Sequence, residues 1–439
     1  MPHILLLGTL DTKLEEVLYL RSRLLETAAR FSIPLGITLI DCGRQLTSCD
    51  VATVSHTDLV TKYSQGDPSD MLSWTRGQVI RFIAGCVTRC VRTLVTTSKI
   101  HGVIGAGGSG GTSLIAAAMR DAVPMGLPKL IVSTVASGDT GPIVGETDIT
   151  LMYSVVDIAG TNGLLRNVLG NAAGAIFGMA VAYEHDTKVA NPSNTESQSG
   201  WKTRIGITMF GVTTPCVDRI RHHLEGKYPA EVYVFHATGH GGKAMERLVE
   251  EGRIDAVLDI TTTEICDLIA GGNMSAGPSR LEAALKRGIP NIISLGATDM
   301  VNLGPVDTVP HQYRDRSLLV HNSSVTIMRT SSEECRKVGE FIVDKIKTYA
   351  KDPKLVEIWI PRGGVSNLAT PGGLFADLEA DTILADTIRS GLEGSGCRVV
   401  DDRRDINDVA FASDIAERLM TLVGYASNGN TFLRHQLLS

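Results

Sequence analysis

The segment HGVIGAGGSGGTSLIAAAM, residues 101–119, is the most informative part of this chain for its fold class. Its apolar start HGVI predicts a buried β-strand, and its end SLIAAAM has the pattern of a helix. Five glycines lie between them, together with Ser109, Thr112 and Ser113. A strand that passes through a glycine-rich loop into a helix is typical of parallel α/β sheets. The segment therefore predicts an α/β fold.

The residues on either side repeat this pattern. Further apolar strand signals occur at His3–Leu7, Leu35–Ile40 and Lys129–Val132, and each ends in a polar or glycine-rich turn. Helical patterns at Leu14–Ala29 and Met71–Thr93 lie between them. Fully apolar strands that alternate with helices indicate a parallel sheet with both faces covered. Because such sheets bind ligands at the carboxyl ends of their strands, the loops after the strands are the candidate sites.

A polar segment divides the chain. Residues 184–200, EHDTKVANPSNTESQSG, contain few apolar side chains and predict a linker. After it, strand–loop–helix units recur in the same order: TRIGITMFGVTTPC parallels PHILLLGTLDTK, and IDAVLDITTTEIC parallels HGVIGAGGSGGTS. A duplication and the shared physics of parallel sheets both explain the recurrence. We expect two Rossmann-like domains with mainly parallel sheets, at residues 1–184 and 202–439, joined by residues 185–201 and binding ligand in a cleft at the strand carboxyl ends.

The composition excludes several classes of protein. A hydrophobic fraction of 43% in 439 residues excludes a disordered chain. The net charge is −6 and no basic stripe is visible, so we expect no direct binding of nucleic acid. No run of about 18 apolar residues is apparent, so no membrane span is expected. The eight scattered cysteines lack a CxxC pair, which favours free thiols and a cytoplasmic location.

The glycine-rich loop Gly105–Ser113 is the strongest candidate for binding an anion. Glycines leave backbone N–H groups open to a ligand at a helix N-terminus, where the helix dipole favours a phosphate. The loop lacks the Gly-Lys-Ser/Thr ending of a Walker A motif. Gly105, Gly107 and Gly110 fit the GxGxxG spacing, but no acidic residue after a second strand is persuasive. Close packing of the strand against the helix is the alternative explanation.

Two neighbouring loops are expected to meet this one. Gly8–Lys13, GTLDTK, ends the first strand and offers two threonine hydroxyls, a lysine cation for phosphate and the carboxylate of Asp11 for a metal or a hydroxyl group. The alternative is that Asp11 or Thr12 only caps the following helix. Ser133–Gly138 ends a later strand with hydroxyls and a glycine, as an ordinary turn also would.

Four titratable residues of the second half lie at or near predicted strand ends: Asp259, Glu264, Asp299 and His321. As a set lining one cleft, they would act as acid–base groups or metal ligands. Taken singly, each better suits a helix cap or an ion pair than catalysis. We predict that the set is catalytic.

Two further residues are weaker candidates. Arg362 stands beside two glycines and would hold a carboxylate or a phosphate. Cys216 follows a proline at a predicted helix start, where a thiolate would be favoured, but no partner histidine is identifiable.

Longer motifs carry a family resemblance. The segments GTLDTK, VIGAGGSGGTSL, STVASG, GITMFGVTTPCV, VFHATGHGGKAMERLV, LDITTTE, GATDMVNLGP and HNSSVTIMRT together resemble the ATP-binding domain family of the plant resistance protein against tomato mosaic virus, the Tm-one type. The resemblance covers about residues 3–425 and implies a two-domain Rossmann-like protein that binds ATP with Mg²⁺ and forms a homodimer. Plant members inhibit viral RNA replication by binding the replication protein.

The resemblance also implies where the nucleotide binds, whereas it leaves the metal ligands unassigned. The expected nucleotide-binding residues are Gly8, Thr9, Asp11, Thr12, Lys13, Gly105, Gly107, Gly108, Ser109, Gly110, Gly111, Thr112, Ser113, Thr134, Ser137 and Gly138.

Two functions follow from these observations. The first is an ATP-dependent enzyme that acts on a small molecule in a cleft between the domains, with the four titratable residues of the second half as its catalytic groups. The second is a non-catalytic, nucleotide-gated module that binds a protein partner through a surface around Ser64–Lys99. A nicotinamide-linked dehydrogenase is a third, weaker interpretation of the GxGxxG-like spacing.

Overall fold

The computed structural model describes residues 1–66, 73–190 and 202–425. The chain divides into two compact units, residues 1–196 and 197–439. The last helix of the first unit, α6 (Gly163–Ala190), extends into the segment expected to be a linker, because its polar end from Glu184 onward is still helical. The rest of that segment, residues 191–201, lies outside the described residues.

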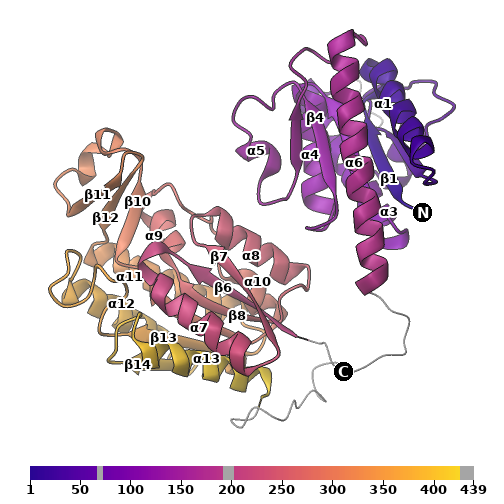
Figure 1. Cartoon of the computed structure of the whole chain (residues 1–439). Coiled ribbons are helices and arrows are strands. Elements are labelled where there is room, and N and C mark those ends of the chain that lie inside the picture. The colour runs from indigo at the N-terminus through magenta and orange to yellow at the C-terminus, as the bar shows by residue number, and fades with distance from the viewer. Residues whose placement is uncertain (67–72, 191–201, 426–439) are drawn as a thin grey trace. The chain divides into compact units, whose positions relative to one another are not determined.

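Unit 1 is a five-stranded parallel sheet covered by helices (Figure 1). The strand order is β2-β1-β3-β4-β5. The strands are β1 (His3–Gly8), β2 (Gly36–Asp41), β3 (Gly102–Gly107), β4 (Lys129–Ser133) and β5 (Thr150–Tyr153). The helices are α1 (Leu10–Arg30), α2 (His56–Tyr63), α3 (Arg76–Thr97), α4 (Ser109–Ala122), α5 (Gly141–Val144) and α6.

Two apolar layers cover the two faces of the sheet in unit 1, and β1 contributes alternate side chains to each. Leu5 and Leu7 of β1 pack with α2, α3 and α4 on one face of the sheet. Ile4 and Leu6 pack with α1 and α6 on the other face. Successive side chains of a strand point to opposite faces of the sheet. A continuous apolar run therefore contributes to both layers, as expected for a sheet buried on both sides.

Helix α6 alone among the described helices is long and apolar enough to cross a membrane by length and composition, although no such span was expected. One side of α6 belongs to the core, because Leu165, Leu169 and Ile176 are fully buried against the sheet. A core helix passes the same test of length and composition.

Unit 2 contains a six-stranded parallel sheet and a smaller antiparallel one. The strands are β6 (Thr203–Met209), β7 (Ala230–His236), β8 (Ala256–Thr261), β9 (Asn291–Gly296), β10 (Met300–Leu303), β11 (Leu318–Asn322), β12 (Val325–Arg329), β13 (Val356–Pro361) and β14 (Arg398–Asp402). The helices are α7 (Thr214–Lys227), α8 (His240–Glu250), α9 (Thr263–Ala270), α10 (Glu282–Arg287), α11 (Ser332–Tyr349), α12 (Leu378–Gly391) and α13 (Val409–Val423).

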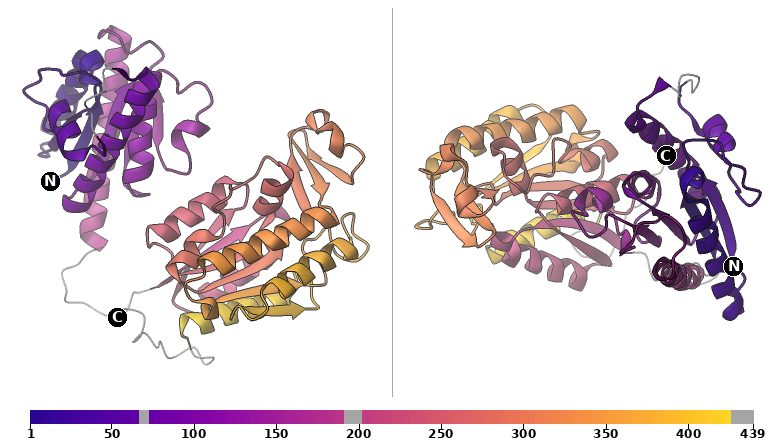
Figure 2. Two further views of the ribbon diagram at one scale, coloured as in Figure 1. Left: turned by 180° about the vertical axis from the view of Figure 1, so that it is seen from behind. Right: turned by 90° about the horizontal axis from the view of Figure 1, so that it is seen from above.

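The large sheet of unit 2 has the order β14-β13-β9-β8-β6-β7. Read from the other end, this order repeats that of unit 1, with β6 in the place of β1 and β8 in the place of β3. Helices α9 to α12 cover one face, and α7 and α13 cover the other. The view from behind in Figure 2 shows α11, in orange, lying across the large sheet. The α/β class and the mainly parallel sheets predicted from the sequence are confirmed.

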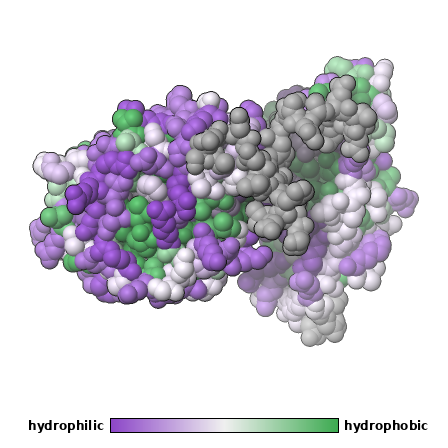
Figure 3. All heavy atoms as spheres, turned by 90° about the horizontal axis from the view of Figure 1, so that it is seen from below, coloured by the Kyte–Doolittle hydropathy of each residue, from purple (hydrophilic) through white to green (hydrophobic). Residues whose placement is uncertain are grey.

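The antiparallel sheet β10-β12-β11 stands out from the rest of unit 2 (Figures 1 and 2). Met300 of β10 and Ile327 of β12 pack in a small apolar cluster with Phe210 and Phe375. On the face of the molecule in Figure 3, hydrophilic side chains surround small apolar patches.

Candidate functional site

The carboxyl ends of β1 and β3 form a topological switch point in unit 1. The chain leaves β1 toward β2 on one side and leaves β3 toward β4 on the other. Accordingly, α1 and α4 pack on opposite faces of the sheet. In open α/β sheets ligands bind in the crevice at such a point. Both segments that flank it were singled out from the sequence as loops, at Gly8–Lys13 and Gly105–Ser113. In the structure Gly105–Gly107 end β3 and Ser109–Ser113 begin α4, so only Gly108 lies between strand and helix.

Helix α4 begins at this point without a side-chain cap. Its N-cap residue is Gly108, which has no side chain to cap the first turn. By contrast, α3 and α11 begin with capping boxes, at Thr75 and Ser331. The first amides of a helix have no intrahelical acceptor, and the helix dipole makes that end positive. The first turn of α4, from Ser109 to Gly111, therefore offers N–H donors to an anion.

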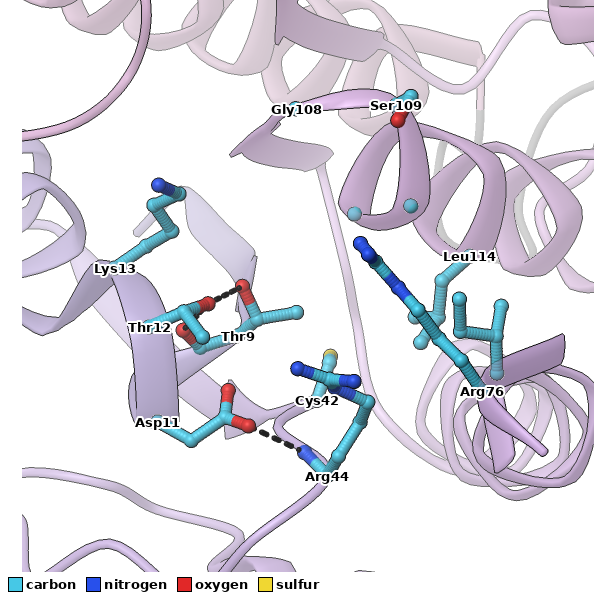
Figure 4. A pocket seen from close by; sticks show the side chains of 13 residues that line it. Thr9, Asp11, Thr12, Lys13, Cys42, Arg44, Arg76, Gly108, Ser109 and Leu114 are labelled. Carbon is cyan, nitrogen blue, oxygen red and sulfur yellow. Dashed lines mark hydrogen bonds between the residues drawn. The ribbon is translucent and has the colours of Figure 1, made fainter. Parts of the chain in front are cut away.

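Three cations surround the start of α4. Lys13 of α1, Arg44 after β2 and Arg76 at the start of α3 line the same pocket as Gly108 and Ser109. In Figure 4 the side chain of Arg76 extends toward the first turn of α4, whereas Lys13 and Arg44 lie across the pocket from it. Within the part of the chain that the structure describes, no carboxylate forms an ion pair with any of the three. Their charges are therefore available to an anionic ligand.

The pocket has an accessible volume of about 220 Å³. Its lining is completed by two threonines, an aspartate, two further glycines and three mostly apolar side chains: Thr9, Thr12, Asp11, Gly110, Gly111, Cys42, Ile80 and Leu114. Amides, hydroxyls and cations dominate the lining, and this donor set suits phosphate oxygens.

The loop after β1 places its polar groups in this pocket through an irregular first helical turn. Thr9 is the N-cap residue of α1 but makes no side-chain cap, and its hydroxyl lies 3.0 Å from that of Thr12. Lys13 has non-helical backbone angles (φ −135°, ψ 30°), so the helix is kinked there. Asp11 Oδ2 accepts a hydrogen bond from the backbone N–H of Arg44 at 3.0 Å and so ties this loop to the end of β2. Asp11 and Thr12 are thus not the N-cap that was the alternative explanation.

Some of the predicted glycines serve packing and do not line the pocket. A β-carbon on Gly8 would lie 2.5 Å from Val17 Cγ2, and one on Gly105 would lie 2.7 Å from Ile115 Cδ1. A β-carbon on Gly107 would lie 3.0 Å from the Cα of Gly111. These three glycines permit close strand–helix contact, which was the alternative explanation for the loop.

The remaining predicted residues of unit 1 do not line the pocket. Thr112 is buried, and its hydroxyl bonds to the carbonyl of Gly107 and to the hydroxyl of Ser133. Ser113 is exposed on the second turn of α4, and Ser137 and Gly138 are exposed in the turn after β4. Thr134 is the nearest of this group, since its hydroxyl would be 3.8 Å from a β-carbon on Gly108.

In unit 2, one buried arginine holds two of the predicted catalytic carboxylates. Arg280 donates to both oxygens of Asp259, at 2.5 and 2.6 Å, and to Glu264 Oε2 at 2.7 Å. All three residues are 1% exposed. Glu264 Oε1 accepts the N–H groups of Gly239 and Gly242, at 2.7 and 3.0 Å, and so fills the start of α8 as an anion would. This geometry favours a structural role for Asp259 and Glu264, in contrast to the acid–base role expected.

The other two predicted catalytic residues lie in different surroundings. Asp299 is fully buried, its Oδ2 accepts the hydroxyl of Ser366 at 2.7 Å, and burial raises its pKa to about 6. His321 is exposed on β11 of the antiparallel sheet. The four residues therefore do not form the single cluster that the sequence analysis expected.

The two weaker candidates also have structural partners. Arg362 Nε lies 3.5 Å from Asp401 Oδ1 in an ion pair. Cys216 is fully buried, and burial raises the pKa of its thiol, so the thiolate expected at this helix start is disfavoured.

Sequence reasoning missed the two arginines of the pocket. Arg44 lies shortly after the end of β2, and the rule that ligands meet strand ends was a usable signal for it. Arg76 opens α3, far from any strand end, and no local pattern marks it. Only the packing of α3 against α4 brings Arg76 to the pocket.

Family comparisons cover both units. The N-terminal domain of the uncharacterised protein family UPF0261 matches residues 2–185, and the C-terminal domain of that family matches residues 202–423. The chain belongs to the UPF0261 family. The family match thus spans both units and includes the pocket of unit 1.

Similar sequences occur in a bacterium and in a plant. A UPF0261 protein of Clostridium tetani is 40% identical over 423 residues, which cover 96% of this chain and 98% of that protein. The ToMV resistance protein Tm-1 of Solanum lycopersicum is 38% identical over 431 residues, which cover 96% of this chain but only 56% of the tomato protein. The resemblance drawn from the motifs is thereby confirmed.

Solved structures add little to this picture. A crystal structure of UDP-N-acetylglucosamine 2-epimerase matches with 11% identity and a TM-score of 0.19, covering 66% of this chain and 78% of that chain. A score this low supports no inference about function.

Proposed function

We propose that unit 1 binds ATP by its phosphate groups in the pocket between β1 and β3. The observation that carries the proposal is the set of three cations around the uncapped start of α4, none of which has a carboxylate partner among the described residues. Oriented amides and a helix dipole favour a phosphate at such a place, and arginine forks match its oxygens. The motif resemblance implies ATP as the nucleotide.

The test is isothermal titration of the full chain with ATP, ADP and NAD. ATP should bind, and Arg76→Ala should weaken the binding by about 10- to 100-fold, because a hydrogen bond to a charged group contributes about 1.5–3 kcal/mol. Arg92→Ala is the matched control, since Arg92 is exposed farther along the same helix, outside the pocket lining. Equal ATP affinity of the Arg76 variant and the wild type, or tighter binding of NAD than of ATP, would contradict the proposal.

A second role for the nucleotide is gating of a protein-binding surface. Arg76 and Ile80 of the pocket lie within Ser64–Lys99, the stretch expected to form that surface. Bound phosphate would tie this stretch to α4. The gating role predicts that a nonhydrolysable ATP analogue acts as well as ATP, whereas an ATP-dependent enzyme would release ADP when supplied with its substrate.

A further inference from the structure

Two carboxylates converge beside the phosphate pocket. Asp11 lies in the first turn of α1, and Asp41 ends the neighbouring strand β2. Asp11 Oδ1 and Asp41 Oδ1 each lie 2.9 Å from the position that a β-carbon on Gly43 would occupy. Any larger residue than glycine would therefore collide with both carboxylates, so the chain keeps this space open.

Each carboxylate has one bound oxygen and one oxygen without a partner. Asp41 Oδ1 accepts the N–H groups of Leu10 at 3.2 Å and Gly43 at 2.8 Å, while Asp11 Oδ2 accepts that of Arg44. Asp11 Oδ1 and Asp41 Oδ2 are buried and have no hydrogen-bond partner among the described residues. Asp41 is only 1% exposed. Because a buried carboxylate oxygen without a partner is costly, a water, a proton or a cation would stabilise the protein here.

The donor set suits a hard divalent cation. Mg²⁺ commonly uses one or two carboxylates and completes its shell with water and the phosphate oxygens of a substrate. In the described ranges no group of three or more His, Cys, Asp or Glu side chains is arranged to hold a metal. A cation at this place would therefore depend on oxygens that the ligand supplies, and Asp11 already lines the phosphate pocket.

We propose that Asp11 and Asp41 hold a Mg²⁺ ion that binds together with the phosphate groups of the ligand. This inference rests on the proposed binding of ATP. The cation would neutralise phosphate charge on the side of the pocket that faces β2, while the first turn of α4 and Arg76 hold the other side. The competing explanation is a proton shared by the two carboxylates, which the raised pKa of Asp41, caused mainly by burial, would also permit.

The experiment compares ATP binding with EDTA and with Mg²⁺ by isothermal titration of the full chain. In the wild type, Mg²⁺ should tighten ATP binding by about tenfold or more, since an interaction between charged groups contributes about 1.5–3 kcal/mol. Asp41→Asn should abolish this enhancement, measured as the ratio of ATP affinities with Mg²⁺ and with EDTA, while asparagine keeps the Oδ1 acceptor for Leu10 and Gly43 and so preserves the loop. Asp121→Asn, at an exposed aspartate of α4, is the control that should behave as the wild type.

The outcomes separate this inference from the proposed function. No ATP binding in either buffer would overturn the proposed function. Binding in both buffers with equal affinity in the wild type would overturn the cation site alone, and so would a full Mg²⁺ enhancement in Asp41→Asn. If Asp41→Asn does not fold, which its circular dichroism would show, Asp11→Asn decides by the same ratio of affinities.

Discussion

Replacing Gly111 by alanine should strengthen the fold and weaken the ligand site at once. Gly111 lies in the first turn of α4 and lines the pocket, and a β-carbon there would meet no atom within 4 Å. Its backbone φ is not in the left-handed region, so alanine fits without strain. In the ligand-free protein the methyl group would enter open space, whereas a bound phosphate would have to occupy the same space.

The two effects have separate magnitudes. Glycine within a helix costs roughly 0.5–1 kcal/mol relative to alanine, so Gly111→Ala should stabilise unit 1 by up to that amount. For a domain of this size the gain corresponds to a rise in Tm of roughly 1–4 °C. Displacing phosphate from one first-turn amide should cost about 1.5–3 kcal/mol of binding, which is roughly a 10- to 100-fold loss of ATP affinity.

The assay is thermal unfolding with and without ATP, followed by isothermal titration. Gly178→Ala is the matched control, because Gly178 lies on the exposed side of α6 and its β-carbon would also meet nothing within 4 Å. It should stabilise unit 1 to a similar extent and leave ATP binding unchanged. Gly111→Ala with wild-type ATP affinity would refute the assignment of the α4 start as the phosphate site. A lower Tm without ligand would refute the account of Gly111 as a glycine kept for the ligand.

Two further predictions concern unit 2. Arg280→Met should lower the unfolding free energy of unit 2 by about 3–5 kcal/mol in urea titrations, because it leaves the buried carboxylates of Asp259 and Glu264 uncompensated. The double variant R280M/E264Q should lose less unfolding free energy than the sum of the two single variants. Simple additivity would argue against this ion network. Burial raises the pKa of Asp267 from 3.8 to about 7, so the folded state binds more protons than the unfolded state between about pH 4 and pH 7 and the unfolding free energy should fall as pH rises through that window. Asp267→Asn should flatten this pH dependence in urea titrations at pH 5 and pH 8, and an unchanged slope would show that another group causes it.

The local sequence pattern was sufficient to predict those pocket residues that lie close to the end of a predicted strand. Gly108 directly follows β3, and Gly110 and Lys13 lie near the starts of the helices that follow β3 and β1, so the predicted strands point to all three. Local pattern was not sufficient to separate glycines that face a ligand from glycines that permit packing. Gly107 belongs to the second kind only because the first turn of α4 folds back to within 3.0 Å of its β-carbon position.

The carboxylates of unit 2 also show that local sequence does not predict which groups a side chain contacts. Asp259 and Glu264 stand at strand and helix ends, where acid–base residues often lie. Their partner Arg280 comes much later in the chain, just before α10, and no spacing in the sequence joins it to them. Asp41 was overlooked although it ends a strand, because its proximity to Asp11 appears only when the loop after β1 lies beside the end of β2.

The sequence by itself determined the α/β class and the glycine-rich start of α4 after β3, because strand and helix periods and the freedom of glycine act over a few neighbouring residues. The tertiary structure alone decided which charges are neutralised and which are open. Strand order β2-β1-β3 brings Arg44 and Lys13 to the start of α4, and the packing of α3 brings Arg76 there. In unit 2 the fold brings Arg280 to its carboxylates. An electrostatic interaction depends on the distance between charges and on their burial, and those quantities are set by how elements pack and not by how far apart they lie in the chain.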